Sequence, residues 1–217
     1  MKEKRPLLSR DYILTKALDL INEKGIKVLS MRNLGKALGV EAMSLYNHVS
    51  NKDEILSGVL DMIVNRISIP DEGSDWCSAI KEYALSARSV FKKYPWATAL
   101  MNSHLGSGPS RLNYYDTMIR TFCQAGFSLE QAARSFSLID SYIYGFLLQL
   151  DNLDTADQTE RSTEKERISK FSENTGMQNY PYLEKMTKWA MENNYDSEKD
   201  FEFGIDLILS ALKRMLS

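Results

Sequence analysis

Apolar residues recur at the spacing of an α-helix along almost the whole chain. In residues 9–24, for example, Ile13, Ala17, Leu20 and Ile21 lie at i, i+4, i+7 and i+8, on one helical face. No stretch of four to eight residues alternates β-branched and polar side chains between turn dipeptides, so nothing in the pattern predicts a sheet. The five prolines fall between the periodic segments, where a missing N–H does least harm. The chain is therefore predicted to be all-α.

Local capping signals define the ends of the expected helices. Ser9, Ser30 and Asn51 are residue types that accept hydrogen bonds from the first backbone N–H groups of a helix, whereas Gly25 and Gly39 favour helix ends. The polar segment 151–176 is expected to be largely mobile, because it has little apolar surface to bury. The predicted helices are 9–24, 30–38, 41–48, 53–67, 75–93, 96–101, 110–124, 128–149, 182–192 and 197–216.

Composition excludes several classes of protein. With 43% hydrophobic and 26% charged residues, the chain can bury a core and is not predicted to be disordered. Its longest nearly apolar stretch, Tyr142–Leu148, is far shorter than the roughly 20 residues of a membrane helix. The charged N-terminus runs into a polar segment without the apolar region of a secretory signal, so we expect a cytoplasmic protein. No cofactor is predicted, and Cys77 and Cys123 match no zinc-binding spacing.

Charge is distributed unevenly along the chain. Residues 1–52 contain ten Lys and Arg against five Asp and Glu, whereas residues 67–217 contain sixteen against twenty-one. A basic N-terminal part suits an anionic partner, although a solvated surface with a chance imbalance would look the same.

Residues 30–52 contain the most informative pattern. Two short helices joined at Gly39-Val40 must cross steeply, which requires a small residue at the crossing and a residue that tolerates positive φ in the turn; Gly35 and Gly39 fit these needs. If Leu34, Leu38, Val40 and Leu45 face the neighbouring helices, the opposite face of 41–48 is exposed. That face carries hydrogen-bonding and cationic groups suited to phosphates and base edges, namely Met43, Ser44, Tyr46, Asn47 and His48, with Lys52 just beyond.

Residues 9–66 resemble the N-terminal DNA-binding domain of the TetR (tetracycline-repressor-like) family of bacterial transcription regulators. The resemblance rests on 29–34 (LSMRNL), 38–40 (LGV), 45–49 (LYNHV) and 51–56 (NKDEIL). It continues more weakly in 94–96 (YPW), 108–109 (GP), 124–128 (QAGFS) and 142–146 (YIYGF), which resemble the C-terminal domain of the tetracycline repressors themselves. The resemblance implies an N-terminal helix-turn-helix DNA-binding domain, residues 1–66, and a C-terminal helical-bundle regulatory and dimerisation domain, residues 67–217.

The resemblance also implies a homodimeric repressor that binds a palindromic, double-stranded DNA operator and is released by a small-molecule effector. Tyr46 and Lys52 match positions that contact phosphates, and His48 a position that contacts backbone or base. Arg32, Met43 and Ser44 match positions that reach bases, and an arginine can read guanine bidentately. Ser30 can position a phosphate through its hydroxyl. Two alternatives stay open from the residues alone: Tyr46 can instead pack between helices, and His48 can instead cap one.

The C-terminal half is predicted in less detail. Helices 128–149 and 197–216 have surplus apolar surface that an isologous dimer would bury, and the expected interface residues are Gly145, Phe146, Gln149, Ile208 and Leu212. Large side chains that can line an effector pocket, or form ordinary core, are Met62, Tyr83, Trp96, His104, Tyr115, Phe122 and Tyr144. His104 lies where tetracycline-binding relatives bind magnesium through a histidine, but no second ligand accompanies it, and no metal site is predicted.

Two other classes of function remain alternatives. An all-α enzyme is disfavoured, because the two histidines, His48 and His104, belong to no recognisable catalytic or metal-binding motif. A thiol-based redox sensor on the same scaffold would use Cys77 or Cys123, yet Cys123 lies in an apolar helix and Cys77 has an acidic rather than a basic neighbour.

Overall fold

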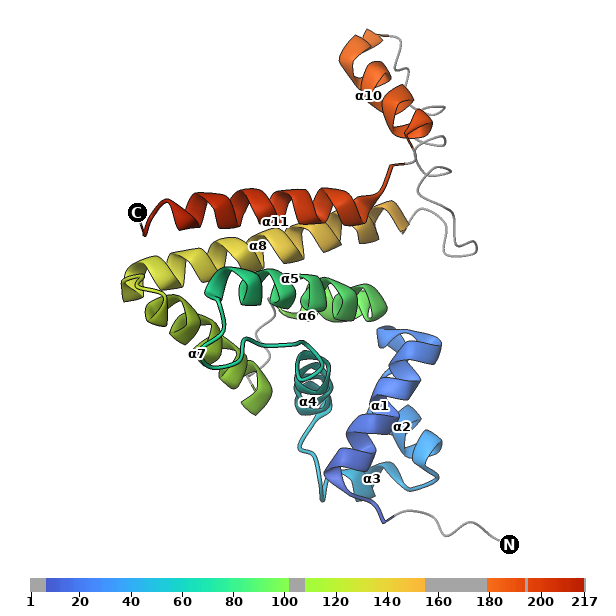
Figure 1. Cartoon of the computed structure of the whole chain (residues 1–217). Helices are drawn as coiled ribbons and strands as arrows, with labels where there is room; N and C mark the ends of the chain where they lie inside the picture. Colours follow the sequence, from blue (N-terminus) through green and yellow to red (C-terminus); the bar gives the residue numbers. More distant parts are fainter. Residues whose placement is uncertain (1–6, 102–107, 155–178, 194, 217) are drawn as a thin grey trace, which may run out of the picture. The chain divides into compact units, whose positions relative to one another are not determined.

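The computed structural model describes residues 7–101, 108–154, 179–193 and 195–216. Every regular element within these ranges is helical (Figure 1), which confirms the predicted all-α class. The chain divides into two compact units, Met1–Ser137 and Leu138–Ser217. None of the described helices is both long and apolar enough to span a lipid bilayer.

The N-terminal helices begin and end at the predicted caps. The side chains of Ser9, Ser30 and Asn51 each accept a hydrogen bond from the backbone N–H three residues further on, while Gly25 and Gly39 end their helices. We call helices α1 to α4 and the turns between them the head. Its elements are α1 (Arg10–Lys24), the 3₁₀ turn η1 (Ile26–Val28), α2 (Met31–Leu38), α3 (Ala42–Leu45) and α4 (Lys52–Val64).

One apolar core holds the head together. Helix α1 packs against α2 and α4, and α2 packs against α3. Ile13, Leu34, Leu45 and Val59 come from the four helices and are fully buried. Burying each such side chain stabilises the fold by roughly 1.5–3 kcal/mol. Ala37 on α2 is exposed, because a helix of eight residues has only one narrow buried face.

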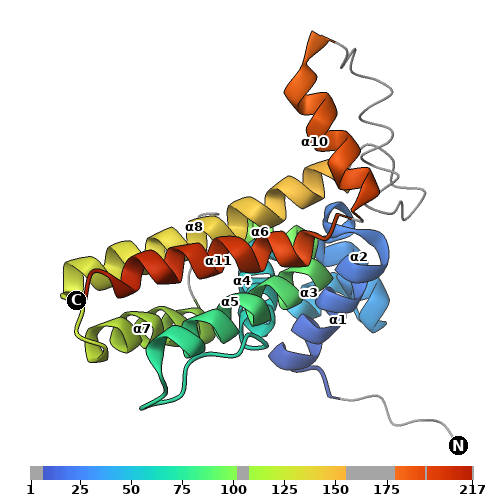
Figure 2. The same cartoon turned by 45° about the horizontal axis from the view of Figure 1, so that its top comes forward.

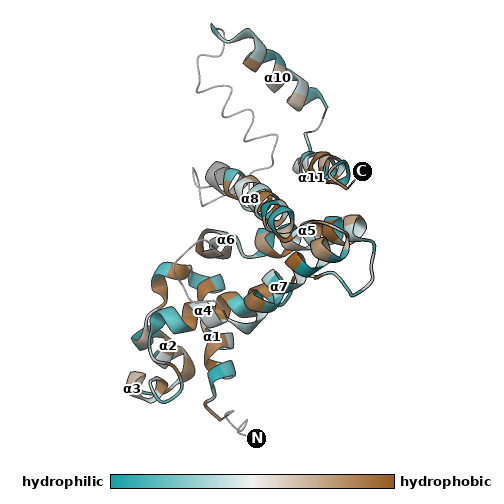
Figure 3. Ribbon diagram, turned by 90° about the vertical axis from the view of Figure 1, so that its left-hand side faces the viewer, coloured by the Kyte–Doolittle hydropathy of each residue, from teal (hydrophilic) through white to brown (hydrophobic). Residues whose placement is uncertain are grey.

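Helices α5 (Trp76–Lys93), α6 (Pro95–Met101), α7 (Pro109–Gln124) and α8 (Leu129–Asp154) follow. Helix α4 packs against α5, α6 and α7 within the first compact unit. Hydrophobic and hydrophilic segments alternate along these helices (Figure 3), as expected of amphipathic helices with one buried side. Packing therefore does not separate the chain at residue 66, and the predicted boundary between domains 1–66 and 67–217 remains a prediction.

Helix α7 buries a face that its apolar residues alone do not mark. Leu112 is exposed, while Arg111, Tyr114 and Met118 lie inside. The reason is that a polar residue, Arg111, occupies the buried side, where a pattern of apolar residues gives no signal.

Several side-chain contacts link the head and the residues just after it to the helices that follow, and two of them involve Arg66 and Trp96. Arg66, just after α4, donates a hydrogen bond to the Tyr94 hydroxyl, and its guanidinium carbon lies 5.2 Å from the centroid of the Tyr94 ring. The Trp96 indole N–H on α6 donates to the Asn22 side-chain oxygen on α1 over 3.3 Å.

The second unit contains the rest of α8 with α10 (Pro181–Glu192) and α11 (Ser197–Lys213). Helices α8 and α11 lie side by side (Figures 1 and 2), with the rings of Tyr142 and Phe201 stacked at 5.4 Å. Helix α8 extends five residues beyond the predicted Gln149. Residues 151–154 are thus helical, whereas 155–176 of the segment expected to be mobile lie outside the described residues.

Candidate nucleic-acid interface

Helices α2 and α3 meet at a turn that requires both of its glycines. Gly39 has φ 69° and ψ 34°, a left-handed conformation that costs other residues roughly 1–2 kcal/mol. A Cβ on Gly35 would lie 3.0 Å from the Val40 carbonyl oxygen and 3.3 Å from the Ala42 Cα, so the two segments approach too closely for a larger residue. The predicted roles of both residues are confirmed.

The third helix is shorter than predicted. Helix α3 covers only Ala42–Leu45 of the expected 41–48, and the chain continues in tight turns in which the Tyr46 and His48 N–H groups donate to carbonyls three residues earlier. Such bonds tighten a last turn and satisfy backbone groups without extending an α-helix. The segment still presents two distinct faces, since Leu45 and Val49 are buried.

Most of the predicted DNA-contacting residues are exposed on the other face. Met43 is 75% exposed although it is apolar, Tyr46 is 48% exposed, and Asn47 and His48 are also exposed, with Ser44 half-buried. The alternative of Tyr46 as a packed hinge fits less well, because burial would leave far less of its ring in solvent. An exposed methionine beside polar groups is a contact surface suited to thymine methyl groups and base edges.

The N-terminus of α2 contributes Ser30 and Arg32. Arg32 is exposed and makes no side-chain hydrogen bond or ion pair among the described residues, so its guanidinium is available. The Ser30 hydroxyl oxygen accepts from the Asn33 N–H over 3.2 Å, which leaves its O–H to donate. Asn33, which sequence reasoning did not single out, donates from its side chain to the Val28 carbonyl over 2.8 Å and holds the entry to α2.

The start of α4 is held by a small network around Glu54. The Glu54 carboxylate accepts from the Ser50 N–H over 2.7 Å and from Arg10 over 3.4 Å, and the Glu54 N–H donates to Asn51. The Ser50 backbone bond, helped by Arg10, keeps the pKa of Glu54 below its ordinary value. This network fixes the first turn of α4, which begins at the half-buried Lys52.

A further exposed cation, Lys36, was not among the predicted contacts. Lys36 follows Arg32 by four residues on α2, so the two side chains share a helical face, and both are exposed. The i, i+4 spacing of the two cations was the available signal.

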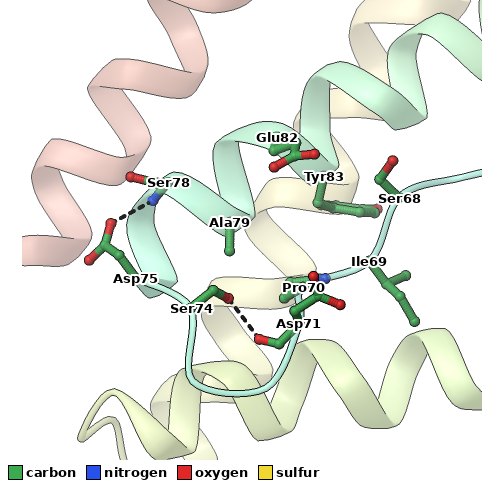
Figure 4. A pocket seen from close by; sticks show the side chains of 10 residues that line it. All are labelled: Ser68, Ile69, Pro70, Asp71, Ser74, Asp75, Ser78, Ala79, Glu82 and Tyr83. Carbon is green, nitrogen blue, oxygen red and sulfur yellow. Dashed lines mark hydrogen bonds between the residues drawn. The ribbon is translucent and has the colours of Figure 1, made fainter.

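One of the predicted pocket residues lines a hollow in the part of the chain that the structure describes. A hollow of about 170 Å³ lies between the start of α5 and the preceding loop (Figure 4), and of the predicted residues Tyr83 alone lines it. That volume is below the roughly 300–1,000 Å³ of sites for drug-sized ligands. Its lining is polar, including the Asp71, Asp75 and Glu82 side chains.

The other predicted pocket residues lie mainly in aromatic clusters or at helix contacts. Phe122 packs against Trp76 and Phe127 with ring centroids 5.9 and 5.4 Å away, and Tyr115 packs against Tyr114 and Phe136. The Tyr83 and Tyr114 hydroxyls are hydrogen-bonded to each other. Met62 and Trp96 are half-buried, Tyr144 is buried in the second unit, and His104 lies outside the described residues.

The predicted interface residues occupy two environments. Phe146 packs against Phe201 at 5.2 Å and Leu212 is buried within the chain, whereas Gln149 is exposed and Gly145 and Ile208 are half-exposed. The exposed apolar row of α11 is instead Phe203, Leu207, Ala211 and Met215, spaced four residues apart. Sequence periodicity did not separate this row from the buried Ile205, Leu209 and Leu212, because apolar residues surround much of the helix.

The described residues contain no group of three or more His, Cys, Asp and Glu side chains that could hold a metal ion. Cys77 and Cys123 are half-buried free thiols.

A helical head whose α2 and α3 join at a left-handed glycine, with an exposed face on residues 43–48, defines a helix-turn-helix DNA-binding protein. Residues 13–59 match the family described as bacterial regulatory proteins, tetR family, and residues 69–216 match the tetracyclin repressor-like C-terminal domain. The chain therefore belongs to the TetR family of bacterial transcriptional regulators.

Individual relatives agree with this assignment. An HTH-type transcriptional regulator of Saccharopolyspora erythraea is 32% identical over 142 residues, which are 65% of this chain and 60% of that protein. The tetracycline repressor protein class D of Escherichia coli is 28% identical over 215 residues, 97% of this chain and 91% of the repressor. The fold is similar to that of Streptomyces coelicolor ActR in complex with actinorhodin, with a TM-score of 0.78, 23% identity and 95% of each chain covered.

Proposed function

We propose that the chain is a homodimeric repressor that binds a palindromic operator through α2 and α3 and is released by a small-molecule effector. The observation that carries this proposal is the exposed face of residues 43–48, where an apolar side chain and hydrogen-bonding groups are presented to solvent while Leu45 and Val49 anchor the segment. A face of this kind fits the major groove of B-DNA, which admits one helix and displays a distinct pattern for each base pair. The protein then acts in the cytoplasm as a regulator and not as an enzyme.

Each residue of the proposed interface has a proposed role. Arg32 reads guanine through two parallel hydrogen bonds, and Met43 contacts a thymine methyl group. Tyr46 and Lys52 contact phosphates, which positions the head without reading sequence, and Ser30 donates to a phosphate near the α2 N-terminus. Ser44, Asn47 and His48 provide further hydrogen bonds to bases or backbone.

Dimerisation places two heads on two half-sites. An isologous interface uses the same surface on both subunits. Helix α11, beside α8, offers an apolar surface for this purpose, formed by the exposed row Phe203, Leu207, Ala211 and Met215. Gly145 on α8 supports close approach, since a Cβ there would meet no described atom within 4 Å. Half-sites would then lie about 34 Å apart or slightly more.

The proposed effector is a small molecule that acts by population shift. The heads of the dimer have one arrangement that binds the operator and another that does not. The effector must have a higher affinity for the arrangement that does not bind. Similar solved structures include ActR in complex with actinorhodin and an Acinetobacter baumannii TetR variant in complex with minocycline, which supports a small organic molecule of this kind as the effector. The hollow of about 170 Å³ described above is too small for such a molecule, so its site must involve other residues.

DNA binding tests the proposal directly. Fluorescence anisotropy would measure binding of the purified chain to a duplex selected from random oligonucleotides, and to a scrambled duplex, at several salt concentrations. Arg32→Ala is expected to weaken binding to the selected duplex roughly 10-fold to 100-fold with little effect on the scrambled one. Lys52→Ala is expected to weaken binding to both duplexes and to lower the slope of log K against log salt concentration by about one. A parent chain without preference for any duplex would refute the proposal.

A further inference from the structure

Helix α7 is capped by a residue of another helix. Its own N-cap residue, Gly108, has no side chain to offer, and Pro109 occupies the first helical position. The Asp61 carboxylate on α4 fills this role, because its two oxygens accept from the Ser110 N–H over 3.1 Å and the Arg111 N–H over 3.0 Å. A carboxylate at this place satisfies two N–H groups that a helix leaves unpaired and also interacts favourably with the helix dipole.

A second hydrogen bond attaches the same turn of α7 to α4. The Arg111 guanidinium donates to the Ser57 hydroxyl over 2.8 Å, and Arg111 is only 2% exposed. Ser57 and Asp61 are four residues apart and therefore share one face of α4. The first turn of α7 is thus joined to two successive turns of α4.

Gly108 makes room for this contact. A Cβ on Gly108 would lie 2.5 Å from both Cγ and Oδ1 of Asp61, which no real Cβ tolerates. Its φ of −81° is open to any residue, so the glycine is required by space and not by backbone conformation.

The same helix α4 begins at the proposed DNA interface. Lys52 is its first residue, and Asp61 lies nine residues later, about 13 Å along a rigid helix. A helix fixed over two turns at one end has its direction fixed at the other.

We propose that Asp61 is a positioning residue: by capping α7 it holds α4, and with it the head, in the orientation that binds the operator. This inference rests on the proposed function. Within that function, it names the contact through which the C-terminal helices set the orientation of the head, and it predicts that separating Asp61 from the α7 N-terminus releases DNA. Asp61 itself touches no base or phosphate in this scheme.

Three variants test the proposal in the full-length chain. Asp61→Ala removes the cap, and Gly108→Ala displaces it from the opposite side without altering α4. Each is expected to weaken binding to the selected operator about tenfold and to change binding to a scrambled duplex less than twofold. Because Asp61→Ala and Gly108→Ala break the same contact, their effects should not add. The double variant should have about the operator affinity of whichever single variant binds less tightly. Asp61→Asn keeps one acceptor oxygen and should restore part of the affinity.

Ser128→Ala is the matched control, since the Ser128 hydroxyl caps α8 by accepting from the Gln131 N–H without involving α4. It should lower the melting temperature about as much as Asp61→Ala while leaving operator affinity unchanged. If the parent binds its operator specifically, and Asp61→Asn, Asp61→Ala and Gly108→Ala all bind that operator with the affinity of the parent, this inference is overturned while the proposed function stands. A parent with no preferred duplex overturns the proposed function and this inference with it.

Discussion

The hydroxyl of Tyr142 occupies the space that a side chain on Gly204 would need. Tyr142 on α8 donates to the carbonyl oxygens of Asp200 and Phe201 on α11 at 3.2 and 3.1 Å, and a Cβ on Gly204 would overlap the phenol group. The contact fixes α8 and α11 in one register relative to each other.

The first prediction concerns Gly204→Ala. Exchanging glycine for alanine within a helix ordinarily stabilises a protein by up to about 1 kcal/mol, but here the overlap with Tyr142 should reverse the sign and destabilise by about 1–3 kcal/mol. Urea unfolding monitored by circular dichroism measures the difference. In a Tyr142→Ala background, where the obstructing ring is gone, Gly204→Ala should become neutral or stabilising; an unchanged penalty would contradict the explanation.

The turn of the head gives a second prediction. Gly39→Ala should lower the unfolding free energy by roughly 1–2 kcal/mol, because alanine is strained at φ 69°. Gly39→Asn should cost less, since asparagine tolerates the left-handed conformation better. Thermal unfolding of both variants would check the order, and equal losses would show that lost space and not backbone strain is responsible.

Acid should remove the contribution of Glu54. Its folded-state pKa is lowered by the Ser50 N–H, so the stabilisation is present above the ordinary glutamate pKa and is lost as the pH falls through the lower folded value. Glu54→Gln should therefore be less stable than the parent by about 0.5 kcal/mol at pH 7, a small value because the side chain is a third exposed. The difference should shrink in urea titrations as the pH falls below the ordinary glutamate pKa and through the lower folded value, and Glu23→Gln on α1 provides the control.

Lys36 on α2 should contribute to DNA affinity without contributing to sequence preference. Lys36→Ala is expected to lower the slope of log K against log salt concentration by about one. It should weaken binding to the selected and the scrambled duplex to the same extent. A loss confined to the selected duplex would instead indicate a base contact.

Charges on the exposed row of α11 should dissociate the proposed dimer. Leu207 is 55% exposed and Phe203 67% exposed in the single chain, so Leu207→Glu and Phe203→Glu should leave the fold intact while raising the dimer dissociation constant at least 100-fold. Analytical ultracentrifugation measures this constant. Tyr182→Glu, at an 83% exposed position of α10, is the matched control and should leave the dimer unchanged.

Features set by near neighbours in the sequence were predictable, and features set by distant ones were not. The ends of α1 follow from Ser9 and Gly25, and the start of α2 follows from Ser30, because each signal involves residues within a few positions. The exposed face of residues 43–48 was predictable for the same reason.

The contact of Asp61 with α7 had no local signal. Asp61 and Arg111 are fifty residues apart, and a polar pair that becomes buried looks like two surface residues in the sequence. Likewise, the exposed row of α11 could not be separated from the buried one, since Phe203, Leu207, Ile205 and Leu209 are equally apolar and only the fold distinguishes them.

The hydrogen bond between Trp96 and Asn22 makes the intrinsic fluorescence of Trp96 sensitive to the contact between α6 and α1. The indole of Trp96 spans α1 and α6, so any rearrangement that separates them changes the polarity and quenching around this fluorophore. The other two tryptophans serve as internal references, because Trp76 lies among the rings of Phe122 and Phe127 and Trp189 is mostly exposed on α10. Movement of the head can therefore be followed by intrinsic emission, in real time and without a label, while candidate effectors are added.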